Sequence, residues 1–345
     1  MLKFNEKARK KMQKNVRGNS SVVSIKKRYP LVSIITACYN SEKYIERLLQ
    51  SILIQNYPSI EVIAVNDGST DKTLEILNSY KKRFPDNGYK LEIITQKNKG
   101  PSSAFNTGIK KFSGDYLTFI ADDDFLKPDS IKNRVDYLKK HDDCDMVYGA
   151  VEVVSENDVN KVIFTRRIKP FPKNGNLFSN MMLGKNYYYG GLAHLIRTDY
   201  FLSIHPKRDI ANYKLGQNIQ IFLPLYYKGK VGYITKPVAT ILERKDSHSR
   251  KERTEKELRE RREEFFDVIV DTLRKINMPE QERENYIFAV QKWRGAFFVI
   301  KKLRKENSEL IKKNAQQKSE LDSHLGIKRS ARLLAGNIKR MLLKL

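Results

Sequence analysis

From Pro30 onward, short apolar runs alternate with segments of helical periodicity. Runs rich in β-branched residues predict strands at residues 31–37, 60–65, 91–94 and 115–121. After Ser41, apolar residues recur at helical spacing, and these are Tyr44, Ile45, Leu48, Leu49 and Ile52. This alternation predicts an α/β fold with an open, mostly parallel sheet that is covered by helices on both faces.

Local signals predict where three further helices begin. Ser69 or Thr70 can cap the helix that carries Leu74, Ile76 and Leu77. A helix is expected over residues 102–111. Pro128 can open the next one, because its missing N–H has no partner in the first turn of a helix.

Polar clusters directly follow the first, second and fourth predicted strands. They occupy residues 38–41, 66–71 and 122–124. In an open α/β sheet, ligands bind outside the carboxyl ends of the strands. We therefore expect these three clusters to meet at one edge and to form a site.

The rest of the chain changes character twice. Residues 146–243 mix strand and helix signals and include an aromatic, glycine-containing stretch at 186–194, where we place the acceptor half of the site. Residues 251–264 form a dense mixed-charge run typical of a solvated helix, and the apolar residues that return after it predict a small helical appendage. The expected organisation is a basic tail (1–29), a main domain (30–249, with halves 30–145 and 146–249) and a helical C-terminal region (250–345).

The net charge of +26 over 345 residues implies an anionic partner, either nucleic acid, an acidic membrane face or phosphorylated ligands. The basic N-terminus has no apolar core and is not a secretory signal, and no apolar run reaches the ~20 residues that span a bilayer. Residues 327–345 predict a basic amphipathic helix. It either binds an anionic membrane or docks on its own protein, and the pattern favours neither. The apolar run around Cys38 predicts a buried free thiol, which is consistent with a reducing cytoplasm.

Three consecutive aspartates, Asp122, Asp123 and Asp124, form what we call the carboxylate triplet. Such acids at the end of a buried strand repel one another unless a cation neutralises them, and Mg²⁺ or Mn²⁺ is held by one or two carboxylates together with substrate phosphates. Alternate side chains of an extended segment point to opposite sides, so not all three can be ligands. A solvated acidic turn is the competing interpretation, and the position after a core strand favours the metal.

Two loops can supply further contacts to an anionic ligand. Gly68 allows a sharp turn beside Asp67, whose carboxylate can accept hydrogen bonds from a ribose or a base. Residues 98–106 form a glycine-containing loop that enters a helix, and its backbone donors and Lys99 can face phosphate. Each loop by itself would more often be an ordinary turn.

The order and spacing of these pieces are much more specific than any one of them. Residues 31–131 resemble the family 2 glycosyltransferases of the GT-A fold, a Rossmann-like fold of nucleotide-diphospho-sugar transferases. The matching segments are 32–40, 45–57, 61–71, 98–100, 106–108, 114–124 and 128–131. The resemblance weakens beyond Val154 and is negligible after about Arg250.

The resemblance implies roles for several residues. Thr36, Tyr39 and Asp67 would line the nucleotide pocket. Asp122 would lie near the ribose, while Asp123 would be the principal metal ligand and Asp124 its neighbour. Many members of the family carry an acidic residue at the position of Ala121, so the metal motif is shifted towards its later carboxylates here.

The same resemblance implies an inverting transfer, in which a carboxylate deprotonates the acceptor hydroxyl. The Glu-Asp pair that usually supplies this base corresponds to Gln217 and Asn218, and amides cannot act as bases at neutral pH. The Gly-Gln-Asn pattern resembles a bacterial subgroup of these enzymes, which favours a specialised site, and Asp209 is a weaker candidate for the base. His248 can reach the metal or be a surface residue, whereas His194 is more often structural.

These observations predict a metal-dependent enzyme of cell-surface glycan synthesis, at the cytoplasmic face of the membrane. Its donor would be a nucleotide diphosphate-sugar, most often a UDP-sugar. Its acceptor would be a glycan or a polyprenyl-linked sugar, and the basic termini would contact anionic lipid. A non-catalytic nucleotide-sugar-binding homologue is the alternative that Gln217 and Asn218 leave open. Nucleic acid is not expected as a partner because no recognition motif accompanies the charge. The sequence does not indicate an oligomeric state.

Overall fold

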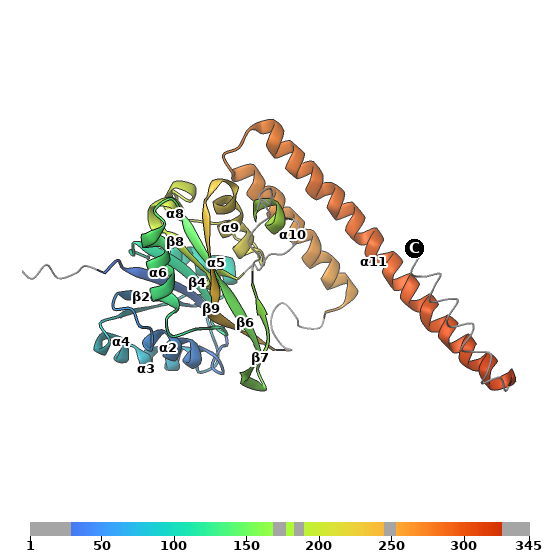
Figure 1. Cartoon of the computed structure of the whole chain (residues 1–345), viewed down its shortest axis with the longest axis horizontal. Coiled ribbons are helices and arrows are strands. Elements are labelled where there is room, and N and C mark those ends of the chain that lie inside the picture. Colours follow the sequence, from blue (N-terminus) through green and yellow to red (C-terminus); the bar gives the residue numbers. More distant parts are fainter. Residues whose placement is uncertain (1–28, 168–176, 183–189, 245–252, 326–345) are drawn as a thin grey trace, which may run out of the picture. The chain divides into compact units, whose positions relative to one another are not determined.

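The computed structural model describes residues 29–167, 177–182, 190–244 and 253–325 (Figure 1). By its contacts the chain divides into Met1–Pro30 and Leu31–Leu345, and all the elements below belong to the second unit. The part of the chain outside the described residues includes the predicted basic tail up to residue 28, residues 186–189 of the aromatic stretch, His248 and the predicted terminal helix. The domain limits proposed from the sequence remain predictions.

The first half of the sheet is parallel, as predicted. Strands β1 (Val32–Cys38), β2 (Ile60–Asn66), β3 (Lys90–Thr95) and β4 (Tyr116–Ala121) lie in the order β3-β2-β1-β4. Every residue of β2 is buried, as are all but one of β1. A parallel strand that is buried on both faces needs an uninterrupted apolar run, and this is why these strands could be located from the sequence.

The second half of the sheet adds antiparallel pairs to a sheet that is mostly parallel, as predicted. β8 (His194–Arg197) pairs antiparallel with both β4 and β6 (Met146–Ser155). β9 (Val231–Glu243) runs parallel to β6 and pairs antiparallel with the short β5 (Phe125–Leu126). β7 (Asp158–Arg166) follows β6 after a tight turn, and a connection of that length allows only an antiparallel hairpin.

Helices cover both faces of the sheet, and consecutive strand residues contribute to the cores on opposite faces. Ile34 belongs to one apolar core and Ile35 to the other, as the period of two in a strand requires. The first core holds α2 (Ile45–Leu53), α3 (Thr73–Tyr80), α4 (Arg83–Asp86) and α6 (Ser130–Lys140). The second holds α5 (Pro101–Ile109), α7 (Leu177–Met182), α8 (Thr198–Ile204), α9 (Gln217–Lys228) and the C-terminal helices.

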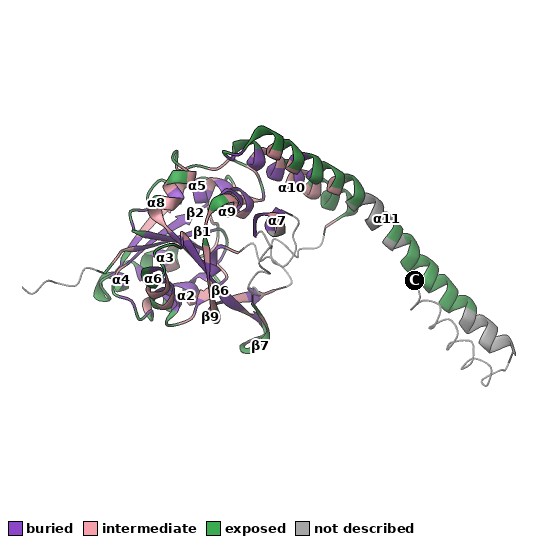
Figure 2. Ribbon diagram, turned by 45° about the horizontal axis from the view of Figure 1, so that its top comes forward, coloured by how far each residue is buried: buried purple, intermediate pink, exposed green. Residues whose placement is uncertain are grey.

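The predicted helical appendage is present. Helix α10 (Glu255–Lys275) begins with a capping box between Thr254 and Glu257, and it packs on α9 through buried apolar side chains. Helix α11 (Glu280–Leu325) packs on α10, where Trp293 meets Phe266 edge to face at 5.0 Å. Residues 306–317 of α11 are exposed (Figure 2). None of the described helices carries a stretch long and hydrophobic enough to span a lipid bilayer.

Two of the predicted helix starts are displaced. Helix α3 begins at Thr73, and Asp71, rather than Ser69 or Thr70, accepts the free backbone N–H of Thr73 at 3.0 Å. Helix α6 begins at Ser130, two residues after Pro128. The third prediction, a helix over residues 102–111, is close, because α5 spans Pro101–Ile109. Pro101 stands in its first turn.

Candidate active site

The carboxylate triplet follows β4 directly, at the edge where β1 also ends. Ala121, the last residue of β4, is the register partner of Ala37 in β1. The backbone N–H of Tyr39 donates to Asp122 Oδ2 at 3.2 Å, so the polar clusters after the two strands do meet. Asp124 is 5% exposed, and its Oδ1 accepts the backbone N–H of Leu242 in β9 at 3.1 Å. Asp124 therefore helps to hold the end of β4 to β9.

The three acids differ in their electrostatic surroundings. Burial raises the pKa of Asp122 to about 7, and the negative charge of Asp123 adds to that rise. The same two causes hold the pKa of Asp124 well above its usual range. Asp123 is neutralised by a guanidinium, since Arg244 Nε lies 2.9 Å from its Oδ2, with both side chains less than a fifth exposed. Arg244 therefore balances the charge of one of the three acids.

Asp67 occupies the neighbouring loop after β2, and its carboxylate is already engaged. It accepts the backbone N–H of Gly100 at 2.8 Å and that of Lys99 at 3.1 Å, and Gln96 Nε2 donates to it at 2.7 Å. Gly68 has φ +71°, and a Cβ there would lie 2.8 Å from the backbone nitrogen of Asn98, so the sharp turn needs glycine. The carboxylate of Asp67 therefore ties the two loops together.

The other residues expected in the nucleotide pocket lie in different surroundings. Tyr39 is 49% exposed at the end of β1, and Lys99 is also exposed. Thr36 is fully buried within β1, where its hydroxyl lies 3.9 Å from Cys38 Sγ. The structure thus places Thr36 away from the pocket surface that was expected for it.

A cavity of about 680 Å³, which we call the main cavity, contains the carboxylate triplet. Two further segments line it, residues 190–192 and residues 214–219 at the start of α9. Gly191 passes very close to β4, because a Cβ on it would lie 2.6 Å from Phe119 Cβ and 2.7 Å from the Phe119 carbonyl oxygen. The basic residues of its lining are Lys214, Arg244, Arg253, Arg261 and Arg262.

Comparison with known proteins agrees with this geometry. Residues 33–201 match the family model described as glycosyl transferase family 2. The chain contains a family 2 glycosyltransferase domain. Over 109 residues it is 41% identical to an uncharacterized glycosyltransferase of Haemophilus influenzae, an alignment that covers 32% of this chain and 42% of that protein. Over 154 residues it is 41% identical to chondroitin synthase of Escherichia coli, covering 45% and 19% of the two chains.

The curated relatives of the glycosyltransferase domain are matched over less than half of their own length. Among solved structures, the fold resembles Staphylococcus aureus TarS (residues 1–349), with a TM-score of 0.54 and 21% identity. That comparison covers 74% of this chain and 69% of the TarS chain. The GT-A type of fold predicted from the sequence is thereby confirmed.

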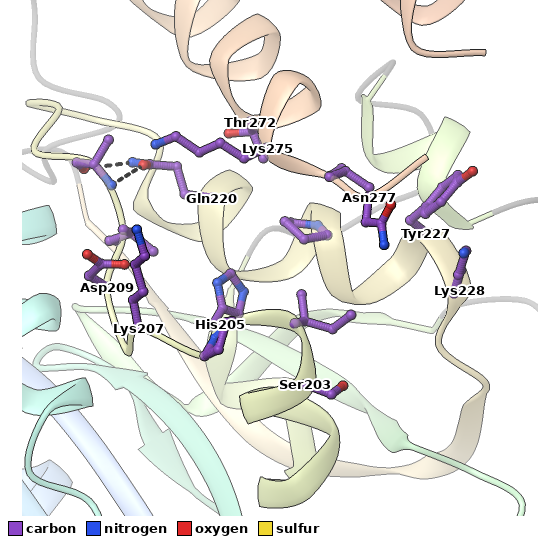
Figure 3. Close-up of a pocket in the computed structure, with 16 residues that line it drawn as sticks. Ser203, His205, Lys207, Asp209, Gln220, Tyr227, Lys228, Thr272, Lys275 and Asn277 are labelled. Carbon is purple, nitrogen blue, oxygen red and sulfur yellow. Dashed lines mark hydrogen bonds between the residues drawn. The ribbon is translucent and has the colours of Figure 1, made fainter. Parts of the chain in front are cut away.

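The fold brings two of the three candidate catalytic residues to the main cavity. Gln217 and Asn218 are the first two residues of α9, and both line the cavity with the carboxylate triplet. Asp209 does not join them. It is exposed and lines a separate cavity of about 630 Å³ between α8, α9 and the end of α10, beside Lys207 and His205 (Figure 3). Its position therefore does not support its role as the base.

The side chains of the site that could coordinate a metal ion meet its requirements only in part. Among the described residues, no three His, Cys, Asp or Glu side chains are grouped as a metal cage. Each of the three acids has one carboxylate oxygen engaged by a protein group, but only Asp124 is buried, which leaves Asp122 and Asp123 as possible ligands. One or two carboxylates are what Mg²⁺ takes from a protein when substrate phosphates complete its coordination. The site suits a metal that arrives with a diphosphate.

Arg134 on α6 is a site-supporting residue that the sequence did not reveal. Its side chain is fully buried, and its Nη1 donates to the carbonyl of His194 at 2.6 Å and to that of Leu192 at 3.0 Å. Burial lowers its pKa to about 9. Arg134 thus fixes the segment that carries Gly191 along the main cavity. A lone arginine within an apolar helix face was the only signal in the sequence.

His194 is structural, as expected. It is fully buried, its ring stacks on Phe222 at 4.3 Å, and Nε2 lies 2.5 Å from the hydroxyl oxygen of Tyr226. Burial lowers its pKa to about 3. The unfolded chain, with a pKa near 6.5, then binds more protons than the folded protein between pH 3 and pH 6.5, so stability falls as the pH falls through this window.

We expect this histidine to make the protein acid-sensitive. Between pH 6.5 and pH 5.0, His194 should lower the free energy of unfolding by about 1.5 kcal/mol relative to a residue that cannot titrate. The measurement is urea unfolding of the wild type and His194→Gln at both pH values. The variant is expected to lose less stability on acidification, whatever its absolute stability. Equal losses would contradict the low pKa.

Proposed function

We propose that this protein transfers a sugar from a nucleotide diphosphate-sugar to a hydroxyl of a polysaccharide or lipid-linked acceptor, with inversion and with a divalent metal. The observation that carries the proposal is the main cavity, where the carboxylate triplet after β4 and the amide pair Gln217 and Asn218 share one hollow. Relatives that include chondroitin synthase support synthesis of a bacterial surface polysaccharide as the setting.

On the donor side, we assign Mn²⁺ or Mg²⁺ to Asp123, with Asp122 next to it near the ribose. When bound, the metal would supply positive charge to the leaving diphosphate. Arg244 then exchanges part of its ion pair with Asp123 for a contact with phosphate, since a guanidinium binds either anion in the same forked way. Tyr39, Asp67 and Lys99 remain our proposed contacts to the nucleotide, and Thr36 would act from within β1.

On the acceptor side, the amides of Gln217 and Asn218 can donate and accept hydrogen bonds but cannot take a proton at neutral pH. We propose that they orient the acceptor hydroxyl. His248, which we also propose as a metal ligand, lies outside the described residues. The amide pair also favours a second candidate function, a homologue that binds nucleotide-sugar without turning it over.

For location, we propose peripheral attachment to the inner face of the cell membrane. The net charge of +26 supports this, because a polybasic surface gains roughly 1 kcal/mol per basic residue near an anionic leaflet. The basic tail and the basic segment 327–345, where the contact would be made, both lie outside the described residues.

A donor screen tests the proposed function. The melting temperature is measured with UDP-, GDP-, CDP- and dTDP-sugars, each with and without Mn²⁺, and UDP-sugars come first because a TarS structure was solved with UDP-GlcNAc. We expect one nucleotide class to raise the melting temperature, since a ligand that binds only the folded state stabilises it, by about 2.7 kcal/mol at a hundredfold excess over Kd. Hydrolysis or transfer of that donor supports the enzyme, and binding without turnover supports the homologue. No shift with any donor would contradict both.

A further inference from the structure

Three arginines gather in the wall of the main cavity. Arg253 lies just before the N-cap of α10, and Arg261 and Arg262 lie in its second turn. All three are partly buried, and all three line the hollow that also contains the carboxylate triplet, Gln217 and Asn218. None of the three falls within the segment that matches the family model, which ends at residue 201.

These arginines are held in place by the core beneath them. Phe266, Val268 and Ile269, one to two turns further along α10, are fully buried. Helix α10 also packs closely on the start of α9, because a Cβ on Gly216 would lie 2.8 Å from Val268 Cγ1. The packing of α10 therefore holds the arginines in the wall of the cavity that the amide pair also lines, and a preorganised group loses less entropy when a ligand binds.

The positive charges of the three arginines act on one another. Burial lowers the pKa of Arg261, and the positive charges of Arg253 and Arg262 lower it further, against an opposing effect of Glu264. Like charges in a hollow repel one another, and a bound anion removes that repulsion. Phosphate suits three guanidiniums best among common anions, since it carries close to two charges and three acceptor oxygens.

We propose that the acceptor of this enzyme carries a phosphate group, bound by Arg253, Arg261 and Arg262 beside the hydroxyl that receives the sugar. The inference rests on the proposed function and specifies its acceptor. It assigns the arginines to the acceptor because α10 packs on α9, which carries the amide pair, whereas the donor diphosphate has Arg244 at the carboxylate triplet. Leu258 and Phe265 line the same cavity and can contact an apolar portion of the acceptor.

Matched probes test the proposal without knowledge of the full acceptor. The full-length protein is saturated with Mn²⁺ and with the nucleoside diphosphate identified by the donor screen, so that the donor site is occupied. Binding of citronellyl phosphate is then compared with that of citronellol, and binding of glycerol 3-phosphate with that of glycerol, by ligand-observed NMR. We expect each phosphate to bind at least tenfold more tightly than its alcohol. A stronger response to the citronellyl pair identifies a lipid-linked phosphate, and a stronger response to the glycerol pair a phosphodiester polymer.

Variants test whether the three arginines cause the difference in binding between phosphates and alcohols. Arg261→Gln and Arg262→Gln should each weaken phosphate binding about tenfold while the affinity for the nucleotide is unchanged. Arg259→Gln is the matched control, because it removes the same charge from an exposed position of α10 that is not among the residues lining the cavity. Equal binding of phosphates and alcohols by the wild type would overturn the proposal whether or not the variants fold. So would an equal effect of Arg259→Gln, or a matching loss of nucleotide affinity in Arg261→Gln and Arg262→Gln.

The failure of this inference and that of the proposed function are distinguishable. A protein that binds no nucleotide-sugar in the donor screen contradicts the proposed function. A protein that binds and turns over a donor, but does not discriminate phosphates from alcohols, contradicts only the phosphate-bearing acceptor.

Discussion

Asp123→Asn is expected to reduce kcat/KM for sugar transfer by roughly a thousandfold, because a metal that balances the leaving diphosphate contributes several kcal/mol to the transition state. An amide has no charge to hold that metal. The metal-dependent part of the donor-induced rise in melting temperature should therefore disappear as well. The measurements are a transfer assay and thermal unfolding with the cognate donor, each with and without Mn²⁺.

The same substitution should change the stability of the ligand-free protein little. Arg244 loses its ion pair with Asp123, which destabilises the fold. Asp122 and Asp124 lose a like-charged neighbour that raises the pKa of both, which stabilises it. We expect a shift of the melting temperature within about 3 °C.

Asp136→Asn is the control for this experiment, because Asp136 forms an exposed pair with Lys132 on α6 at 2.6 Å. It should alter neither activity nor the response to metal. If Asp123→Asn retains the full metal-dependent shift, Asp123 is not a ligand.

Arg134→Ala is expected to lower the free energy of unfolding by about 3 kcal/mol, the largest effect on stability that we expect from one side chain. The substitution empties a fully buried volume and removes the guanidinium donor from the carbonyls of Leu192 and His194, of which His194 keeps the hydroxyl of Thr118. The cost of burying the guanidinium, visible in its lowered pKa, offsets part of the loss. Urea unfolding at pH 7 provides the measurement.

Lys139→Ala on the exposed side of the same helix serves as the comparison, and it should change stability by less than about 0.5 kcal/mol. A loss below 1 kcal/mol for Arg134→Ala would mean that the segment with Gly191 is held by other contacts. In that case Arg134 would not be a positioning residue for the main cavity.

Much of the nucleotide half was predictable. The predicted strand at residues 60–65 is found as Ile60–Asn66, and that at 115–121 as Tyr116–Ala121. A strand buried on both faces must be apolar along its length, so its limits are visible in the sequence. The mixed half was not predictable, because β8 is only four residues long and the pairing of β6 with β9 joins segments far apart in the chain.

The candidate site, too, was predictable only in part. The acids at the end of β4 and the amides at the start of α9 could be identified as a motif and as a departure from it, and the structure places both in one cavity. Asp209 lines the separate cavity instead, and its local sequence does not indicate which cavity its loop will reach. The arginines of α10 looked like part of a solvated, mixed-charge helix, since only the packing of α10 on α9 turns them towards the site.

The sequence by itself determined the α/β class, the edge of the sheet that carries the site and the resemblance to a glycosyltransferase family, because each depends on local periodicity and spacing. Only the tertiary structure decided which charges meet. Arg244 neutralises Asp123 from 121 residues away, and Arg134 holds a segment that is 60 residues further along the chain. Such contacts depend on how strands and helices pack. The periodicity of side chains along the sequence does not indicate which residues far apart in the chain will come into contact.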